Sequence, residues 1–254
     1  MATAPPHALI EQFHLLFLGQ LGRGLDKRAF VLKGGCNLRF FYGSVRYSED
    51  MDLDLGGADV HVVQEKVRAV LRARTFADIL RARGIAIEHA TEHKQTTTTQ
   101  RWKLGLQIAG AAVALPTKIE FSRRGLDEGV LFESVDPALV RAYRLPPLML
   151  SHYGPEAALR QKVGALAHRT ETQARDIFDL HHLISGGAGD EALRHASREV
   201  ASKARANAMT IDFPTFKSQV LAYLPAEERA AYDSPVVWDA MVLEVVEPLE
   251  RAGP

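Results

Sequence analysis

The pattern of hydrophobic positions changes character at the Pro-Pro pair 146–147. Before this pair, apolar runs with a period of two residues alternate with stretches at helical spacing, whereas every later signal is helical. Residues 6–27 and roughly 60–83 show helical spacing, and the segments FVL, DMDLDL, IAIEHA, RWKLGLQIAG and PTKIEFSRR are typical of strands. The last two are joined by an alanine-rich turn, which favours antiparallel pairing. The pattern therefore predicts an α+β protein with a sheet-bearing domain at 1–147 and an all-helical lobe at 148–254.

Two adjacent glycines, Gly34 and Gly35, follow the predicted strand FVL. They precede about two turns of helix, CNLRFFYG, in which Gly43 stands where a C-terminal cap is expected. Glycines lack a Cβ atom, so the backbone N–H groups at the start of such a helix can approach an anionic ligand closely. A Gly-Gly pair alone is equally typical of an ordinary strand-to-helix turn.

Three aspartates lie on one face of the predicted strand DMDLDL, opposite its apolar residues. Asp50, Asp52 and Asp54 would stand about 6.6–7 Å apart on that face. Like charges at this spacing repel one another, and aspartate is a poor strand former. A cation removes the difficulty, and Mg²⁺ prefers hard oxygen ligands, as carboxylates and phosphates supply.

Glu120, in the segment TKIEF, is a candidate for a further carboxylate at the same place. If its strand lies beside DMDLDL, Glu120 faces Asp50 and Asp52, and three carboxylates are available for one or two metal ions. A calcium-binding loop is excluded, because an EF-hand counted from Asp50 needs glycine and glutamate where Leu55 and His61 stand.

The order strand, Gly-Gly, short helix, RYSEDMDLD and a later strand carboxylate resembles the polymerase-β-like nucleotidyltransferase superfamily. That superfamily usually has Gly-Ser where this chain has Gly-Gly. With this variant and the later RDIFDLHHL, residues 28–185 resemble the AbiEii/AbiGii toxin family, which includes the MenT-type toxins. The resemblance implies a nucleotidyltransferase-type mixed sheet flanked by helices, followed by an all-helical lobe that completes the nucleotide site. It also implies a toxin that adds nucleotides, in some members to the 3′ end of tRNA.

The resemblance assigns roles to residues of the first domain. Gly34 and Gly35 match the nucleotide-binding turn, and Asp50 and Asp52 match the metal-binding carboxylates. Glu120 matches the third carboxylate, where related enzymes place the base that activates the attacking hydroxyl. The implied cofactor is Mg²⁺, one or two ions, with Mn²⁺ as a substitute. Asp54 has no counterpart in the family.

Charged residues of both parts are candidates for holding the nucleotide. Lys162 matches a family lysine suited to the triphosphate and counts as a catalytic residue as well, and Arg169 lies two helical turns further along the same face. Asp176 matches the family motif, while Asp179 is spaced to pair with Arg175 four residues earlier. Two cations that flank the aspartate strand, Lys33 and Arg46, are candidates for phosphate contacts.

The amino-acid composition gives more information about the cellular compartment of the protein than about the reaction that it catalyses. The chain has 254 residues, of which 46% are hydrophobic, enough to bury a sizeable core. Cys36 is the only cysteine, so neither an intrachain disulfide nor a cysteine zinc site is expected. The N-terminus lacks the basic start of a signal peptide, and no apolar run is long enough for a bilayer. These features predict a cytoplasmic protein without a membrane partner.

Charge is distributed unevenly although the formal net charge is zero. Between Val60 and Arg124 there are twelve Lys and Arg against five Asp and Glu, and from Leu221 onward seven acids against two bases. The basic segment indicates either a surface for a polyanion or a helix with a solvated charged side. It favours a nucleic acid acceptor over a small one.

Together these features predict a Mg²⁺-dependent toxin of a toxin–antitoxin system. It would transfer a nucleoside monophosphate from a nucleoside triphosphate to the 3′ end of tRNA, releasing pyrophosphate and blocking translation. Its partners would be the nucleoside triphosphate, tRNA and a cognate antitoxin protein. The alternatives are transfer to a small molecule such as an antibiotic or to a protein hydroxyl, a carboxylate-dependent nuclease, and a non-catalytic interaction protein.

Overall fold

The computed structural model describes residues 5–108, 111–189, 193 and 196–252. The chain divides into two compact units. A sheet unit comprises Met1–Phe41 and Tyr47–His152, and a helical unit comprises Tyr42–Arg46 and Tyr153–Pro254. The domain division between residues 147 and 148 stays a prediction. The expectation that everything after residue 147 is helical is wrong at Met149–Tyr153, because this segment pairs with Phe30–Lys33 as a strand of the sheet.

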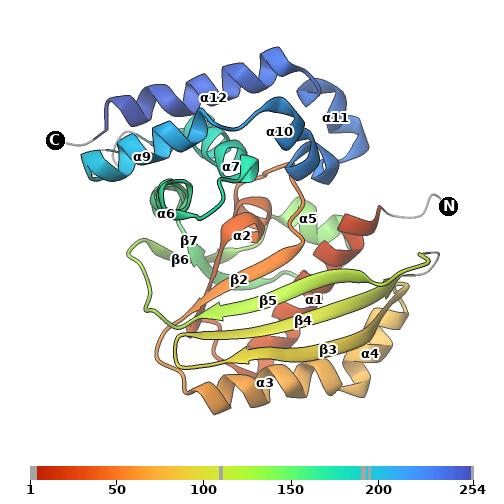
Figure 1. The fold of residues 1–254 in the computed structure, drawn as a ribbon. Coiled ribbons are helices and arrows are strands. Elements are labelled where there is room, and N and C mark those ends of the chain that lie inside the picture. Colours follow the sequence, from red (N-terminus) through yellow and green to blue (C-terminus); the bar gives the residue numbers. More distant parts are fainter. Residues whose placement is uncertain (1–4, 109–110, 190–192, 194–195, 253–254) are drawn as a thin grey trace. The chain divides into compact units, whose positions relative to one another are not determined.

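A mixed sheet forms the centre of the sheet unit (Figure 1). Its seven strands in the described part of the chain have the order β3-β4-β5-β2-β1-β7-β6. The pairs β2–β5 and β1–β7 are parallel, and β1–β2, β3–β4 and β4–β5 are antiparallel, so the predicted antiparallel pairing of RWKLGLQIAG with PTKIEFSRR is confirmed. The strands are β1 (Phe30–Lys33), β2 (Asp50–Leu55), β3 (Ile85–Gln95), β4 (Thr99–Ile108), β5 (Leu115–Ser122), β6 (Val130–Ser134) and β7 (Met149–Tyr153).

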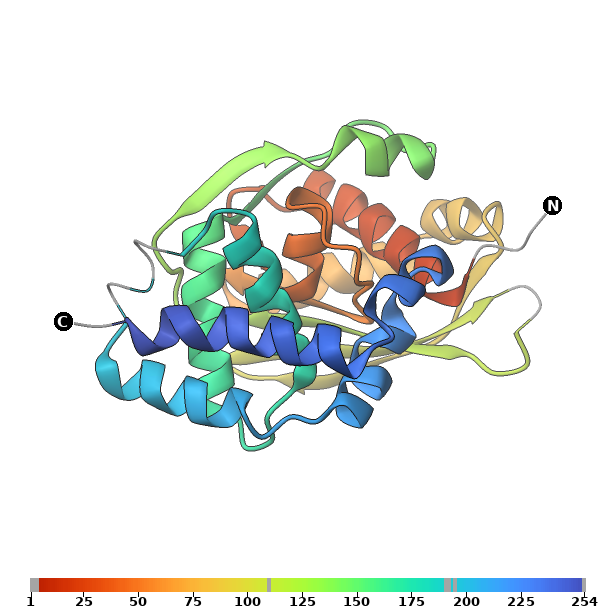
Figure 2. The same ribbon diagram turned by 90° about the horizontal axis from the view of Figure 1, so that it is seen from above.

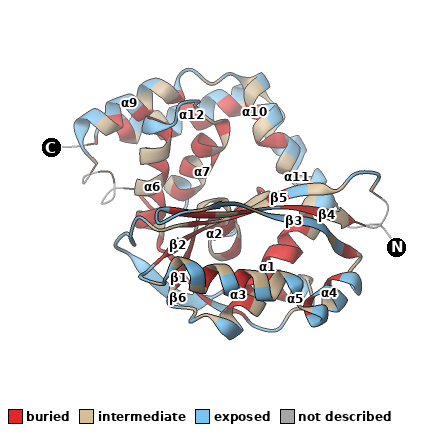
Figure 3. Ribbon diagram, turned by 60° about the horizontal axis from the view of Figure 1, so that its bottom comes forward, coloured by how far each residue is buried: buried red, intermediate tan, exposed pale blue. Residues whose placement is uncertain are grey.

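Helices cover one face of this sheet. Figure 3 shows α1, α3 and α4 together on that side, which we call the helix face. The opposite side carries Asp50 and Asp52, and we call it the aspartate face. The helices of the sheet unit are α1 (Pro6–Gly24), α2 (Gly34–Phe41), α3 (Val60–Arg72), α4 (Arg74–Arg81) and α5 (Pro137–Ala142).

The single helix expected at 60–83 is wrong, because the chain is extended at Ala73 and forms α3 and α4 instead. Val67 of α3 and Phe76 of α4 are both buried in the core. Nine residues of continuous helix make about two and a half turns, which would direct these two side chains to opposite sides. The break at Ala73 turns Phe76 back toward the core.

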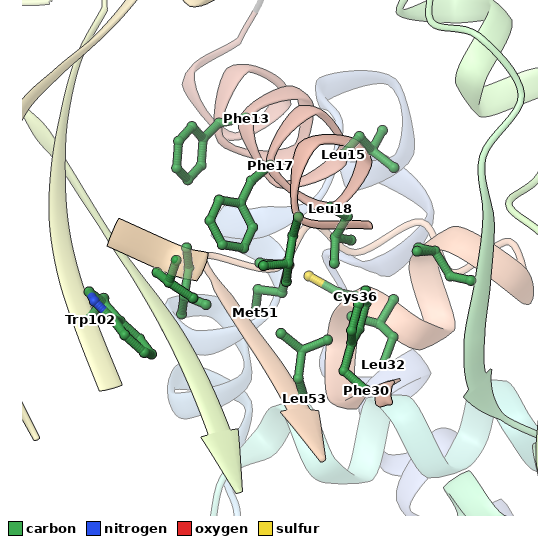
Figure 4. Close-up of a cluster of buried hydrophobic side chains, with 14 of the residues drawn as sticks. Phe13, Leu15, Phe17, Leu18, Phe30, Leu32, Cys36, Met51, Leu53 and Trp102 are labelled. Atoms are coloured by element: carbon green, nitrogen blue, oxygen red, sulfur yellow. The ribbon is translucent and has the colours of Figure 1, made fainter. Parts of the chain in front are cut away.

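The core of the sheet unit lies on the helix face, between the sheet and α1. Phe13, Phe17 and Leu18 of α1 pack on the sheet there, and Met51 and Leu53 of β2 point toward them (Figure 4). Met51 and Leu53 have no exposed surface, so the alternation that predicted β2 also identified its buried face. The aspartates consequently point away from the core.

The helical unit consists of helices and the short segment Tyr42–Arg46. Figure 2 shows α12 running beside α9, and Phe216 and Trp238 stack in the interior with ring centroids 4.5 Å apart. The helices are α6 (Pro155–His168), α7 (Ala174–Ser185), α9 (Arg198–Ala208), α10 (Phe213–Gln219), η1 (Leu221–Tyr223), α11 (Ala226–Tyr232) and α12 (Pro235–Glu250). None of the helices in the described ranges has the length and apolar character needed to cross a membrane.

Candidate active site

The three predicted carboxylates lie on neighbouring parallel strands. Asp52 of β2 is the register partner of Glu120 of β5, and Asp50 precedes Asp52 by two residues on the same face. Register partners on adjacent strands stand about 4.8 Å apart along the hydrogen-bonding direction. The expectation that Glu120 faces the aspartates is therefore confirmed.

Lys118 lies among these carboxylates. Its Nζ is 3.4 Å from Oδ2 of Asp50, 3.7 Å from Oδ1 of Asp52 and 3.7 Å from Oε2 of Glu120. Burial lowers the pKa of Lys118, but the three carboxylates outweigh it, so the net shift of the pKa is upward. Sequence reasoning missed Lys118, although it stands two residues before Glu120 and the strand period puts both on one face.

Arg101 of β4 is a second residue that sequence reasoning missed. It is the register partner of Glu120, and its Nε lies 2.5 Å from Oε2 of Glu120. Partial burial raises the pKa of Glu120, but the hydrogen bond from Arg101 and the charges of Lys118 and Arg101 lower it further, leaving the pKa below its usual value. Glu120 is accordingly ionised at neutral pH.

Gly34 is the residue of the Gly-Gly pair whose conformation requires glycine. Its φ is +67°, a region that side chains disfavour, and a Cβ atom there would lie 3.3 Å from Oδ2 of Asp52. Gly34 is also the first residue of α2, so the start of this helix lies directly against the carboxylate of Asp52. Gly35 follows inside the first turn and is half-buried.

Lys33 and Asp54 form an ion pair on the aspartate face. Lys33 Nζ lies 2.5 Å from Oδ1 of Asp54, whose residue is 4% exposed. The pair gives Asp54 the role that the sequence alone did not supply, which is that of counter-ion to Lys33. A phosphate contact by Lys33 stays a prediction.

The helical unit contains a cluster of five charged side chains built around two buried aspartates. Asp179 lies 2.9 Å from Nη2 of Arg46 and 2.5 Å from Nζ of Lys162. Asp176 lies 3.1 Å from Nζ of Lys162, and its Oδ2 lies 2.7 Å from Nε of Arg169 without a well-oriented hydrogen bond. Both aspartates have no exposed surface.

The cluster tests two expectations about the helices. Lys162 and Arg169 were expected on one face of one helix, but α6 ends at His168 and Arg169 follows it in an extended conformation. Both side chains nevertheless reach the carboxylate of Asp176. The expected pairing of Asp179 with Arg175 is wrong, because the oxygens of Asp179 bind Arg46 and Lys162 instead. Burial raises the pKa of Asp179, but these two cations outweigh it and the net shift of the pKa is downward.

A buried hydrogen-bond network fixes the start of β2. The Asp50 carbonyl accepts from Ser48 Oγ at 2.8 Å and from Cys36 Sγ at 3.3 Å. Thr117 Oγ1 donates to the carbonyl of Glu49, the residue before β2, at 2.6 Å and lies 2.8 Å from Nε2 of His14. Burial lowers the pKa of His14 to about 3 and raises the pKa of the Cys36 thiol, so both are neutral at pH 7. Cys36 therefore supports the strand and is not a nucleophile.

The carboxylates offer the hard oxygen donors that Mg²⁺ prefers. Within the described ranges, however, no three Asp, Glu, His or Cys side chains converge closely enough to enclose a metal ion as they stand. The Lys118 ammonium stands between the three acids and shows where a cation is favoured. The donor chemistry of Asp50, Asp52 and Glu120 thus fits a divalent ion, whose entry requires these side chains to converge.

A family model described as "Nucleotidyl transferase AbiEii toxin, Type IV TA system" matches residues 16–250. No curated protein matches the chain in sequence.

Solved structures from two organisms share the fold. MenT4, a nucleotidyltransferase toxin from Mycobacterium tuberculosis, superposes with a TM-score of 0.62 at 20% identity over 96% of this chain and 82% of its own. JHP933 from Helicobacter pylori has a TM-score of 0.57 at 18% identity, over 98% and 93% of the two chains. A putative nucleotidyltransferase from H. pylori has a TM-score of 0.52 at 19% identity over 94% of each. The predicted α+β fold class is confirmed.

Proposed function

Because the chain belongs to the nucleotidyl transferase AbiEii toxin family of type IV toxin–antitoxin systems, we propose that it transfers a nucleoside monophosphate from a nucleoside triphosphate to the 3′ end of tRNA. The transfer releases pyrophosphate, and the modified tRNA no longer supports translation. The observation that carries the proposal is the register pair Asp52–Glu120 with Asp50 on the same face. A cognate antitoxin protein is the expected partner, in the cytoplasm.

The carboxylates of Asp50, Asp52 and Glu120 would hold one or two Mg²⁺ ions, with Mn²⁺ as a substitute. Bound there, the metal would supply positive charge for the phosphates of the substrate. The position of Lys118 among the same three side chains supports this assignment, because these oxygens already bind a cation.

Residues of the chain itself orient the reacting groups. The N–H groups at the start of α2 donate to a phosphate oxygen, since the missing Cβ of Gly34 leaves the backbone accessible beside Asp52. Glu120, which is ionised at neutral pH, accepts the proton of the attacking hydroxyl. Most of the rate enhancement then comes from positioning and electrostatics.

In the helical unit, the charge balance of the cluster supports nucleotide binding. Three cations, Arg46, Lys162 and Arg169, surround two aspartates, which leaves one positive charge in excess. The side chain of Arg169 is 40% exposed, so it is the member best able to reach a phosphate, with Lys162 behind it. Arg46, at 5% exposed, is better suited to holding Asp179 in place than to contacting phosphate.

An RNA acceptor is supported by basic residues on the aspartate face of β3 and β4. Lys103 is the register partner of Lys118, and Lys94 is the register partner of Arg101, so both point to the face that carries Glu120. Lys94 and Lys103 are exposed. Arg68 of α3 instead binds Glu92 at 2.8 Å and belongs to the helix layer.

The decisive experiment incubates the purified protein with total tRNA and each radiolabelled nucleoside triphosphate in turn, with Mg²⁺ or with a chelator. We expect Mg²⁺-dependent label at the 3′ end of tRNA in the wild-type protein and none in the Asp52→Asn variant. Label on a protein or an added aminoglycoside, with none on RNA, would refute the acceptor. Shortened tRNA without added nucleotide would indicate a nuclease, and no change in any reaction would indicate a non-catalytic protein.

A further inference from the structure

Lys118 is the cation that the three carboxylates of the candidate active site share. It forms ion pairs of 3.4–3.7 Å with Asp50, Asp52 and Glu120. Arg101 is bonded to Glu120, and Lys33 is bonded to Asp54 at 2.5 Å. Three acids on two adjacent strands would repel one another strongly, and a central ammonium relieves that repulsion.

A divalent ion and the Lys118 ammonium cannot use these oxygens at the same time. Mg²⁺ ligands lie at about 2.0–2.1 Å from the ion, and the same oxygens now face an ammonium 3.4–3.7 Å away. A metal held by all three carboxylates would therefore stand within contact distance of Nζ, where two positive charges oppose each other. The flexible four-carbon stem of lysine allows the ammonium to leave.

We propose that Lys118 is the resident counter-cation of the metal-free site and that a divalent ion binds by displacing its ammonium from Asp50, Asp52 and Glu120. This inference rests on the proposed metal-dependent transfer. It gives Lys118 the role of neutralising the three acids until a metal enters. The competition also sets a lower limit on the metal concentration at which the site fills.

The first test measures metal affinity directly. Wild-type protein and Lys118→Met are titrated with Mn²⁺ and with Mg²⁺ by calorimetry, without nucleotide or RNA. Methionine keeps most of the side-chain volume and removes the charge, so we expect the variant to bind the metal about tenfold more tightly, equivalent to about 1.4 kcal/mol. Equal or weaker affinity in a folded Lys118→Met protein would overturn the proposal.

Lys103→Met is the matched control for that titration. Lys103 lies directly across from Lys118 on β4, on the same face, and its removal changes the net charge by the same amount. It has no ion pair with the carboxylates in the described part of the chain. We expect its metal affinity to stay within about twofold of wild type, because an exposed charge at this position is screened by solvent. If both variants bind metal more tightly to the same extent, the increase comes from the change in overall charge, and the proposed competition between the metal and Lys118 is refuted.

Thermal unfolding supplies a second readout that needs no metal binding. In chelator, Lys118→Met should unfold at a lower temperature than wild type and than Lys103→Met, and added Mg²⁺ should restore more stability to it than to wild type. An unchanged midpoint in chelator would overturn the role of Lys118. If Lys118→Met does not fold, Lys118→Arg replaces it and should keep metal affinity at or below the wild-type value, whereas tighter binding would refute competition.

The two proposals fail in different ways. If wild-type protein labels no tRNA in the presence of Mg²⁺, the proposed transfer is refuted, whereas tighter Mn²⁺ binding by Lys118→Met than by wild type still supports the competition at Lys118. If wild-type protein binds metal and modifies tRNA while Lys118→Met matches it in affinity and in stability, only the inference about Lys118 is wrong.

Discussion

Replacing Asp179 by asparagine should destabilise the helical unit more than any change on its surface. Asp179 has no exposed surface and accepts from Arg46 Nη2 at 2.9 Å and from Lys162 Nζ at 2.5 Å. Asparagine fills almost the same space but removes the negative charge, so two largely buried cations lose a common partner. Removing one member of a buried ion pair typically costs about 3–5 kcal/mol.

The assay is thermal unfolding followed by far-ultraviolet circular dichroism. For a chain of this length each kcal/mol shifts the midpoint by about 2–4 °C, so we expect Asp179→Asn to unfold about 6–20 °C below wild type. The control is Asp233→Asn in the same unit, whose partner Lys217 lies 2.8 Å away with both side chains nearly half exposed. An exposed pair of this kind contributes about 1 kcal/mol or less. Equal midpoints for the two variants would refute the buried-cluster argument.

The pH dependence provides an independent check on Asp179. Its pKa is depressed in the folded protein, so the stabilisation from its ionised form is complete above the unfolded pKa of about 3.9. That stabilisation is lost as the pH falls through the folded pKa. The difference in unfolding free energy between wild type and Asp179→Asn should therefore be constant from pH 6 to 8 and should shrink below about pH 4. A difference that persists unchanged in acid would mean that the charge is not the cause.

Three further predictions concern catalysis and binding. Asp52→Asn should abolish transfer. Its unfolding midpoint without Mg²⁺ should stay level or rise, because one of three like charges is removed. Transfer at the wild-type rate would show that Asp52 is not part of the active site. Lys162→Met should weaken nucleoside triphosphate binding about tenfold to a hundredfold, since charge-assisted contacts contribute about 1.5–3 kcal/mol; unchanged affinity by calorimetry would contradict the assignment. Lys94→Glu combined with Lys103→Glu should lower tRNA affinity and flatten its salt dependence without affecting nucleotide binding. Arg68→Glu on the helix layer should leave tRNA affinity unchanged. If Arg68→Glu lowers tRNA affinity and the Lys94→Glu, Lys103→Glu double variant does not, the proposed acceptor surface is refuted.

The carboxylates of the site could be predicted because they depend on local periodicity. Alternation along β2 separates Asp50 and Asp52 from Met51 and Leu53, and one assumption, that β5 lies beside β2, adds Glu120. The structure supports that assumption through the register pair Asp52–Glu120. The position of Lys118 could have been predicted from the same assumption as Glu120, because residues two apart on a strand share a face.

Other features depend on distances in the fold that periodicity does not encode. Arg101 reaches Glu120 only because of the antiparallel register of β4 and β5. Arg46 and Asp179 are 133 positions apart in sequence, so a helical pattern favoured the nearer partner Arg175. The break in the helix at Ala73 likewise depends on the burial of Phe76 in the core. The helical spacing of residues 60–83 in the sequence does not reveal this break.

The basic segment between Val60 and Arg124 shows why a charge count along the chain is a weak guide to a binding surface. A count treats all these cations as one group, but the sheet separates them into two layers. Arg68 binds Glu92 on the helix layer, whereas Lys94 and Lys103 share a face with Glu120 through their register partners. An acceptor whose hydroxyl must reach Glu120 approaches the aspartate face, so only cations on that face can guide its phosphates. The segment therefore still supports an RNA acceptor. The support comes from fewer residues than its composition suggests, and these residues lie on strands β3 and β4 instead of on helix α3.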